Sequence, residues 1–180
     1  MNLVKKFFIN LTLILIGFFI YFLQADFFSW FTISGIKPNL FVIYILFIGL
    51  FGNRSMGIIY GAVCGICLDL LYEANVGINI TGLVLIGILA ILFNKNFSKD
   101  SRITIMLMMA ALTIFYEVFS YVASYVIFST NFELLYFIKI LLVEVAYNVV
   151  LTVILYPAMQ KFGYYIENTY TGNKILTRYF

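Results

Sequence analysis

Residues 103–128 of the chain read ITIMLMMAALTIFYEVFSYVASYVIF, and the single charged side chain in this run is that of Glu117. A helix of about 20 apolar residues is long enough to cross the hydrocarbon core of a membrane. The same character extends over the whole chain, which is 64% hydrophobic and 11% charged. Such a composition cannot supply the water-facing surface of a soluble domain. The sequence therefore predicts an all-α membrane protein with one integral membrane domain over residues 1–180.

Six apolar runs predict six transmembrane helices in a compact bundle. The second, third and fourth runs are short for a hydrocarbon core of about 30 Å, so these helices must be shielded by neighbours, extend into their polar flanks or lie under a thinned bilayer. Pro157 is expected to close the last helix and to leave residues 158–180 as a cytoplasmic tail. The predicted helices cover residues 7–23, 38–52, 57–73, 79–93, 103–128 and 134–156.

The basic residues predict the orientation of these helices. If the N-terminus is inside, only Lys37 and Lys139 of the 11 Lys and Arg residues lie outside. An excess of Lys and Arg on the cytoplasmic side is the rule for membrane proteins, so both termini are expected in the cytoplasm. The cytoplasmic set would be Lys5, Lys6, Arg54, Lys95, Lys99, Arg102, Lys161, Lys174 and Arg178.

The composition also excludes several kinds of chemistry. His is absent and the two cysteines, Cys64 and Cys67, lie inside an apolar run, so no zinc set can be assembled and we interpret both thiols as helix-packing residues. The basic residues form no face interleaved with aromatic side chains, which argues against nucleic-acid binding. No nucleophile stands beside a base at motif spacing. We therefore expect the protein to have no catalytic residues, metal or cofactor. We do expect it to contact membrane lipids.

Gly57, Gly61 and Gly65 recur at a spacing of four residues and form one ridge of a helix. Small residues allow a second backbone to approach closely, so this ridge is a candidate helix-docking surface, although ordinary packing within the chain explains it too. The next step along the ridge is Asp69, an acid near the end of its helix. Asp69 either has a functional role at the rim of the bundle or simply reaches the headgroups.

Two further acids lie deep in the last two predicted helices. Counting about 1.5 Å per residue from the outer ends places Glu117 and Glu144 at a similar depth, and Asn148 lies on the same face as Glu144. No Lys or Arg lies in the core of any predicted span. These acids must therefore be protonated, hydrated in a cavity or met by a partner protein. They are candidate pocket residues, and the alternative is a structural hydrogen bond.

The order of several motifs resembles the family of rod shape-determining protein MreD. The motifs are Lys37-Pro38-Asn39-Leu40, the glycine ridge leading to Asp69 and Gly77, and Tyr147-Asn148 in the last helix. The resemblance covers most of the chain, and Asn39 stands where an acidic residue is common in the family. It singles out Pro38 and Asn39 as a loop motif.

The resemblance implies a non-enzymatic scaffold of the bacterial cell-elongation complex in the inner (plasma) membrane. Such a protein binds the bitopic protein MreC and, through it, MreB, RodA and a class B penicillin-binding protein, and so helps to organise peptidoglycan synthesis and cell shape. The family is also similar in fold to the S-components of energy-coupling-factor vitamin transporters. A substrate-binding S-component is therefore the alternative function, in which Glu117 and Glu144 would line the pocket.

Overall fold

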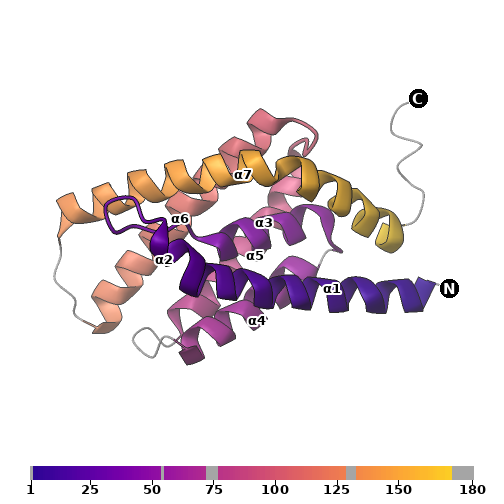
Figure 1. Ribbon diagram of the computed structural model, residues 1–180, viewed down its shortest axis with the longest axis horizontal. Coiled ribbons are helices and arrows are strands. Elements are labelled where there is room, and N and C mark those ends of the chain that lie inside the picture. Colours follow the sequence, from indigo (N-terminus) through magenta and orange to yellow (C-terminus); the bar gives the residue numbers. More distant parts are fainter. Residues whose placement is uncertain (1, 54, 72–76, 129–132, 172–180) are drawn as a thin grey trace.

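The computed structural model describes residues 2–53, 55–71, 77–128 and 133–171, and these are almost entirely helical (Figure 1). Their one β feature is an isolated bridge between Ile33 and Ile36. Residues 72 and 73, the tail residues 172–180 and Arg54 lie outside the described ranges. The elements are α1 (Asn2–Phe22), the π-helical turn η1 (Leu23–Phe27), α2 (Phe28–Trp30), α3 (Leu40–Phe51), α4 (Met56–Leu71), α5 (Ile78–Asn96), α6 (Arg102–Phe128) and α7 (Leu134–Thr171).

Within the described residues, 4 stretches of helix are long and apolar enough to cross a membrane. They are Leu3–Trp30, Ile78–Asn96, Arg102–Phe128 and Leu134–Tyr170. Two shorter apolar helices, Leu40–Phe51 and Met56–Leu70, complete the bundle. The protein is thus an all-α membrane protein with several spans, and a total of six crossings stays a prediction.

The long helices run in alternate directions between two ends of the bundle. At one end the start of α1 lies beside the end of α7: Tyr170 Oη donates a hydrogen bond to Asn10 Oδ1 (3.1 Å), and Lys6 Nζ lies 5.2 Å from the centre of the Tyr170 ring. Figure 1 shows the first turns of α1 and the last turns of α7 at the same side of the molecule. We call this end of the bundle, where α1 begins and α7 ends, the basic end. Helix α3 begins near the opposite end, beside η1 and the middle of α7.

Helix α3 lies at the centre of the bundle, and every one of its residues is buried. Its 12 residues span about 18 Å, which is less than the hydrocarbon core of a membrane. Contacts with α1, α4, α5, α6 and α7 surround it. Shielding by neighbours is therefore how this short helix is accommodated, and it explains why its sequence is apolar all round.

The glycine ridge of α4 packs against α5 of the same chain. A Cβ on Gly61 would lie 2.5 Å from the backbone oxygen of Leu83, and a Cβ on Gly57 would lie 3.1 Å from the backbone oxygen of Gly87. Gly65 faces the backbone of Ile80 in the same way. The absence of side chains lets the two backbones touch, which is the packing that small residues permit in membrane helices.

The expectation that Pro157 closes the last helix is wrong, because α7 continues through Pro157 to Thr171. A proline inside a helix removes one hydrogen bond and costs about 3 kcal/mol. Packing beyond the proline compensates for this loss. Ile166 is buried, Gly163 lies against the ring of Phe51, and Phe162 stacks on Phe47 with 6.2 Å between ring centres. Residues 158–171 are therefore part of the bundle and not a free tail.

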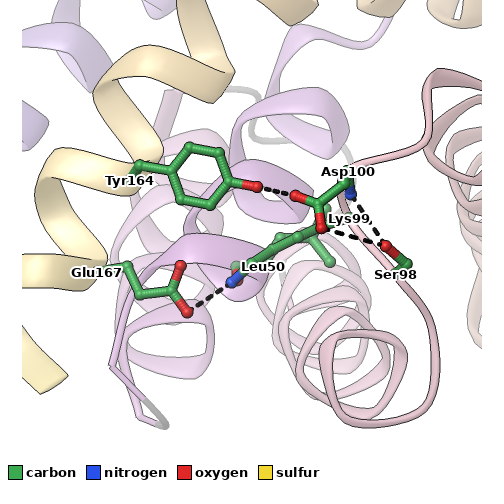
Figure 2. Close-up of polar contacts among 6 residues, drawn as sticks. All are labelled: Leu50, Ser98, Lys99, Asp100, Tyr164 and Glu167. Atoms are coloured by element: carbon green, nitrogen blue, oxygen red, sulfur yellow. Dashed lines mark hydrogen bonds and ion pairs between the residues drawn. The ribbon is translucent and has the colours of Figure 1, made fainter. Parts of the chain in front are cut away.

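A polar clasp holds this extension at the basic end (Figure 2). Lys99 Nζ, in the α5–α6 connection, forms an ion pair with Glu167 Oε1 (2.7 Å) and donates to the backbone oxygen of Leu50 (3.1 Å) near the end of α3. The hydroxyl of Tyr164 donates to the carboxylate of Asp100. A cation at the last carbonyls of a helix also interacts favourably with the helix dipole. The clasp thus connects α3, α7 and the α5–α6 connection.

Candidate functional site

The start of α3 is fastened by side chains from two other helices. Asn39 caps α3, because its Oδ1 accepts a hydrogen bond from the Val42 N–H (3.3 Å). The N–H of Asn39 donates to Asn148 Oδ1 (2.8 Å), and the N–H of Leu40 donates to Gln24 Oε1 (2.8 Å). The first N–H groups of a helix have no partner within the helix, so these contacts satisfy groups that would otherwise be buried without one. The loop motif at Pro38 and Asn39 is therefore a helix-start anchor.

Asn148 of α7 connects three helices. Its Oδ1 accepts from Asn39, and its Nδ2 donates to Thr113 Oγ1 of α6 (3.1 Å). The backbone oxygen of Asn148 accepts from Thr152 Oγ1 (2.7 Å). Asn148 and Thr113 are both 0% exposed. Because buried amides need partners, this set of hydrogen bonds specifies how α3, α6 and α7 meet.

Asp69, near the end of α4, caps the start of α5. Its Oδ2 accepts from the N–H groups of Gly77 (2.9 Å) and Ile80 (3.1 Å), and its Oδ1 accepts from the N–H (3.2 Å) and Nδ2 (2.9 Å) of Asn79. Gly77 has φ of 94°, a left-handed conformation that favours glycine. A carboxylate at the first N–H groups of a helix also complements the positive end of the helix dipole. The geometry gives Asp69 a local structural role, which sequence reasoning did not consider.

A tyrosine carries this network onward from α5 to α6. Tyr116 Oη donates to Asn79 Oδ1 (2.8 Å), and the Tyr116 side chain is buried. Tyr116 also interacts with the side chains of Asn39 and Ser120. The contacts thus continue from Asp69 through Asn79 and Tyr116 to Asn39. We use the name polar layer for these four residues together with Asn148, Thr113, Glu117 and Glu144.

Glu117 of α6 and Glu144 of α7 lie side by side in the polar layer. Their carboxyl groups interact with each other, and Glu144 also interacts with the side chains of Asn39 and Asn148. Glu144 is 7% exposed, and its buried Oε1 makes no hydrogen bond of normal geometry within the described residues. The ion pair found in the described ranges, Lys99–Glu167, lies at the basic end. These ranges therefore place no cation against the two carboxyl groups.

Most of the residues singled out from the sequence meet in this layer. It contains Asn39, Asp69, Glu117, Glu144 and Asn148, while the glycine ridge lies on the α4 face that α5 covers. A partner helix cannot reach the ridge without displacing α5. Sequence reasoning missed four further members of the network or its anchors. Thr113 lies four residues before Glu117, on the same helix face, and could have been included. No pattern distinguished Gln24, Asn79 and Tyr116 from other polar or aromatic residues.

The layer has the chemistry of a structural or binding site. Within the described residues no group of three or more Asp, Glu, Cys or His side chains is arranged to hold a metal ion. Asp69, Asn148 and Asn39 use their polar atoms to satisfy helix ends and one another. The carboxyl pair is the part of the layer that has acceptor capacity left over.

Comparison with known families agrees with the resemblance seen in the motifs. The family described as rod shape-determining protein MreD matches residues 1–166, which include all of the helices up to the last turns of α7. Comparison with curated proteins and with solved structures gave no match. Because the family match covers nearly the whole chain, this membrane protein belongs to the MreD family of rod shape-determining proteins.

Proposed function

We propose that the protein is a non-enzymatic scaffold of the cell-elongation complex, which binds MreC within the membrane and helps to organise peptidoglycan synthesis. The observation that carries this proposal is the family match over residues 1–166. Through MreC the scaffold would be connected to MreB, RodA and a class B penicillin-binding protein. Each of these partners is an expectation from the family.

The construction of the bundle supports a scaffold. The polar layer fastens α3, α5, α6 and α7 to one another, and the clasp fastens the basic end. Buried polar networks of this kind favour one well-defined arrangement of helices. The apolar side chains of α1, α4, α6 and α7 that remain exposed offer contacts for lipid or for partner helices. Since α5 covers the glycine ridge, a partner would use these outer faces.

We place both termini in the cytoplasm of a bacterium, with the helices crossing its inner membrane six times. Six of the described basic residues lie at or toward the basic end, and the other two, Lys37 and Lys139, lie toward the opposite end. The positive-inside rule then puts the basic end in the cytoplasm. The six are Lys5, Lys6, Lys95, Lys99, Arg102 and Lys161.

The carboxyl pair is the proposed point of contact with a positively charged group. Glu117 and Glu144 are close together, half-buried and buried respectively, and without a cation in the described ranges. A bound cation, or an arginine from a partner helix, would offset the cost of holding two carboxylates in a medium of low dielectric constant. Glu144 is the more important of the two in this proposal, because it also contacts Asn39 and Asn148.

Recovery of partners from native membranes tests the proposed function. The tagged protein is extracted in mild detergent and the bound proteins are identified. Recovery of a bitopic partner with an extended domain outside the membrane supports the scaffold. Recovery of an ATPase pair with a coupling subunit would contradict it and support the transporter alternative.

A matched pair of variants makes this test specific for the polar layer. Glu144→Gln removes the charge of the buried acid, whereas Glu133→Gln removes the charge of an exposed acid just before the same helix. We expect partner recovery to fall only for Glu144→Gln. Equal partner recovery with both variants, at equal membrane levels, would contradict a charged contact at Glu144. The scaffold function itself is tested separately, by the partners that the wild type recovers.

A further inference from the structure

An apolar groove of the described bundle opens between α1 and α7, with α3 as its floor. It has a volume of about 430 Å³. Its walls include Ile16 and Phe19 of α1, Ile43 of α3, and Leu155 and Phe162 of α7. The one hydroxyl on its wall, that of Tyr44, donates to the backbone oxygen of Leu13 (2.6 Å) and is therefore already satisfied. The groove has no polar group to offer to water or to a polar ligand.

Contacts join α1 and α7 beyond both ends of the groove. At the basic end, Tyr170 joins α7 to Asn10 of α1. At the other end, the hydroxyl of Tyr147 donates to the backbone oxygen of Phe31 (2.8 Å), and the ring centres of Phe28 and Tyr147 are 6.1 Å apart. The groove is thus a window, bounded by α1 and α7 on its sides and by these contacts at its ends.

The shape of this window selects a flexible chain over a helix. A transmembrane helix with its side chains is about 10–12 Å wide and about 30 Å long, which is several times the volume of about 430 Å³ in this groove, so a whole helix cannot enter it. A lipid acyl chain is thin and flexible, and it surrounds the protein on every side. Burial of an acyl chain against apolar walls contributes about 0.8 kcal/mol per methylene relative to water. Relative to bulk lipid, the gain depends on how closely the chain packs against the walls of the groove.

A cation stands at one end of the window. Lys37 Nζ donates to Ser29 Oγ (2.6 Å), and Ser29 follows Phe28, which lines the groove. Within the described residues no acidic side chain forms an ion pair with Lys37. Trp30 of the same short helix is 87% exposed, and exposed tryptophans of membrane proteins favour the headgroup region. The end of the window beside Lys37 therefore lies where a lipid phosphate would be.

We propose that the window is a binding site for one anionic phospholipid, with an acyl chain lying between α1 and α7 over α3 and the phosphate held by Lys37. The acyl chain fills the apolar groove, and the negative phosphate complements the positive charge at its end. With the basic end in the cytoplasm, this lipid belongs to the outer leaflet. The site does not depend on the identity of the protein partners.

Quenching of Trp30, which is the one tryptophan of the chain, measures the headgroup preference directly. The purified protein is reconstituted in equal mixtures of phosphatidylglycerol and phosphatidylcholine, with bromine on the acyl chains of one lipid or the other. We expect the local preference for phosphatidylglycerol to be about fivefold, which corresponds to the roughly 1 kcal/mol that a basic residue contributes toward an anionic membrane. Lys37→Gln should abolish the preference, and Lys139→Gln, which changes an exposed lysine of α7, should retain it. Equal quenching by both lipids in the wild type would overturn the assignment of the phosphate to Lys37.

Retention of lipid in native mass spectrometry tests the acyl-chain site. Ala158→Phe fills the window from α7, whereas Ala146→Phe adds the same bulk to an exposed position of α7 outside it. We expect the wild type and Ala146→Phe to retain one phosphatidylglycerol and Ala158→Phe to lose it. Equal retention by all three would overturn the site. Loss of partner recovery by Ala158→Phe, with lipid retention unchanged, would assign the window to a partner protein instead. If Ala158→Phe does not fold, lipid retention is measured for the surface variant Lys37→Gln in its place.

Discussion

Replacement of Asp69 by Asn tests whether the turn between α4 and α5 depends on a charged cap. The carboxylate accepts four hydrogen bonds, two at each oxygen, from Gly77, Asn79 and Ile80. An asparagine side chain has one oxygen, so it can satisfy one of these pairs and turns an NH₂ group toward the donors of the other. Hydrogen bonds to a charged acceptor contribute about 1.5–3 kcal/mol each, and two are lost. Because the donor residues Gly77, Asn79 and Ile80 are only half-buried, water replaces part of what is lost, and we expect a net loss of about 2–4 kcal/mol.

Unfolding by sodium dodecyl sulfate in mixed micelles, followed by circular dichroism, measures this loss. Asp69→Asn should lower the unfolding midpoint and Asp69→Ala should lower it further, because alanine satisfies none of the four donors. Asp26→Asn makes the same change of charge at an exposed residue of η1 and is expected to leave the midpoint unchanged. An unchanged midpoint for Asp69→Asn, or a loss no greater for alanine than for asparagine, would refute the capping role.

Four further outcomes follow from the structure. Gly61→Ala should destabilise the bundle in the same assay and Gly17→Ala should not, because a Cβ at Gly61 would meet a backbone oxygen of α5 at 2.5 Å while a Cβ at Gly17 would have its nearest neighbour at 3.7 Å. In partner recovery and rod-shape rescue of a depleted strain, Glu117→Gln should be tolerated and Glu144→Gln should not, and tolerance of both would contradict a charged contact. Tyr164→Phe should lower the unfolding midpoint, because it removes the hydroxyl that donates to the carboxylate of Asp100 in the clasp. An unchanged midpoint for Tyr164→Phe would contradict a stabilising role for this hydrogen bond of the clasp. A reporter fused to the C-terminus should be active only in its cytoplasmic form, and activity confined to the outer side would contradict an even number of crossings.

The sequence determined the class of the protein and the approximate positions of its helices. Apolar runs such as 103–128 are a local property, and lipid as a solvent admits few structures other than helices for such runs. The family could also be identified in this way, because it depends on motifs at given positions along the chain. Four polar residues could be recognised one by one, since polar side chains are rare in apolar helices: Asp69, Glu117, Glu144 and Asn148. Asn39 was recognised through the loop motif of the family.

Only the tertiary structure decided which groups these residues contact. The backbone of Asn39 bonds to Asn148, more than a hundred residues away, and Asp69 caps a helix other than its own. The glycine ridge could have faced any helix, and it faces α5. Pro157 carries a local signal for the end of a helix, but the contacts of Phe162, Gly163 and Ile166 with the rest of the bundle outweigh it. Local propensity is worth a few kcal/mol at such a position, and packing between distant segments decides the outcome because it contributes as much or more and has no signature in the neighbouring residues.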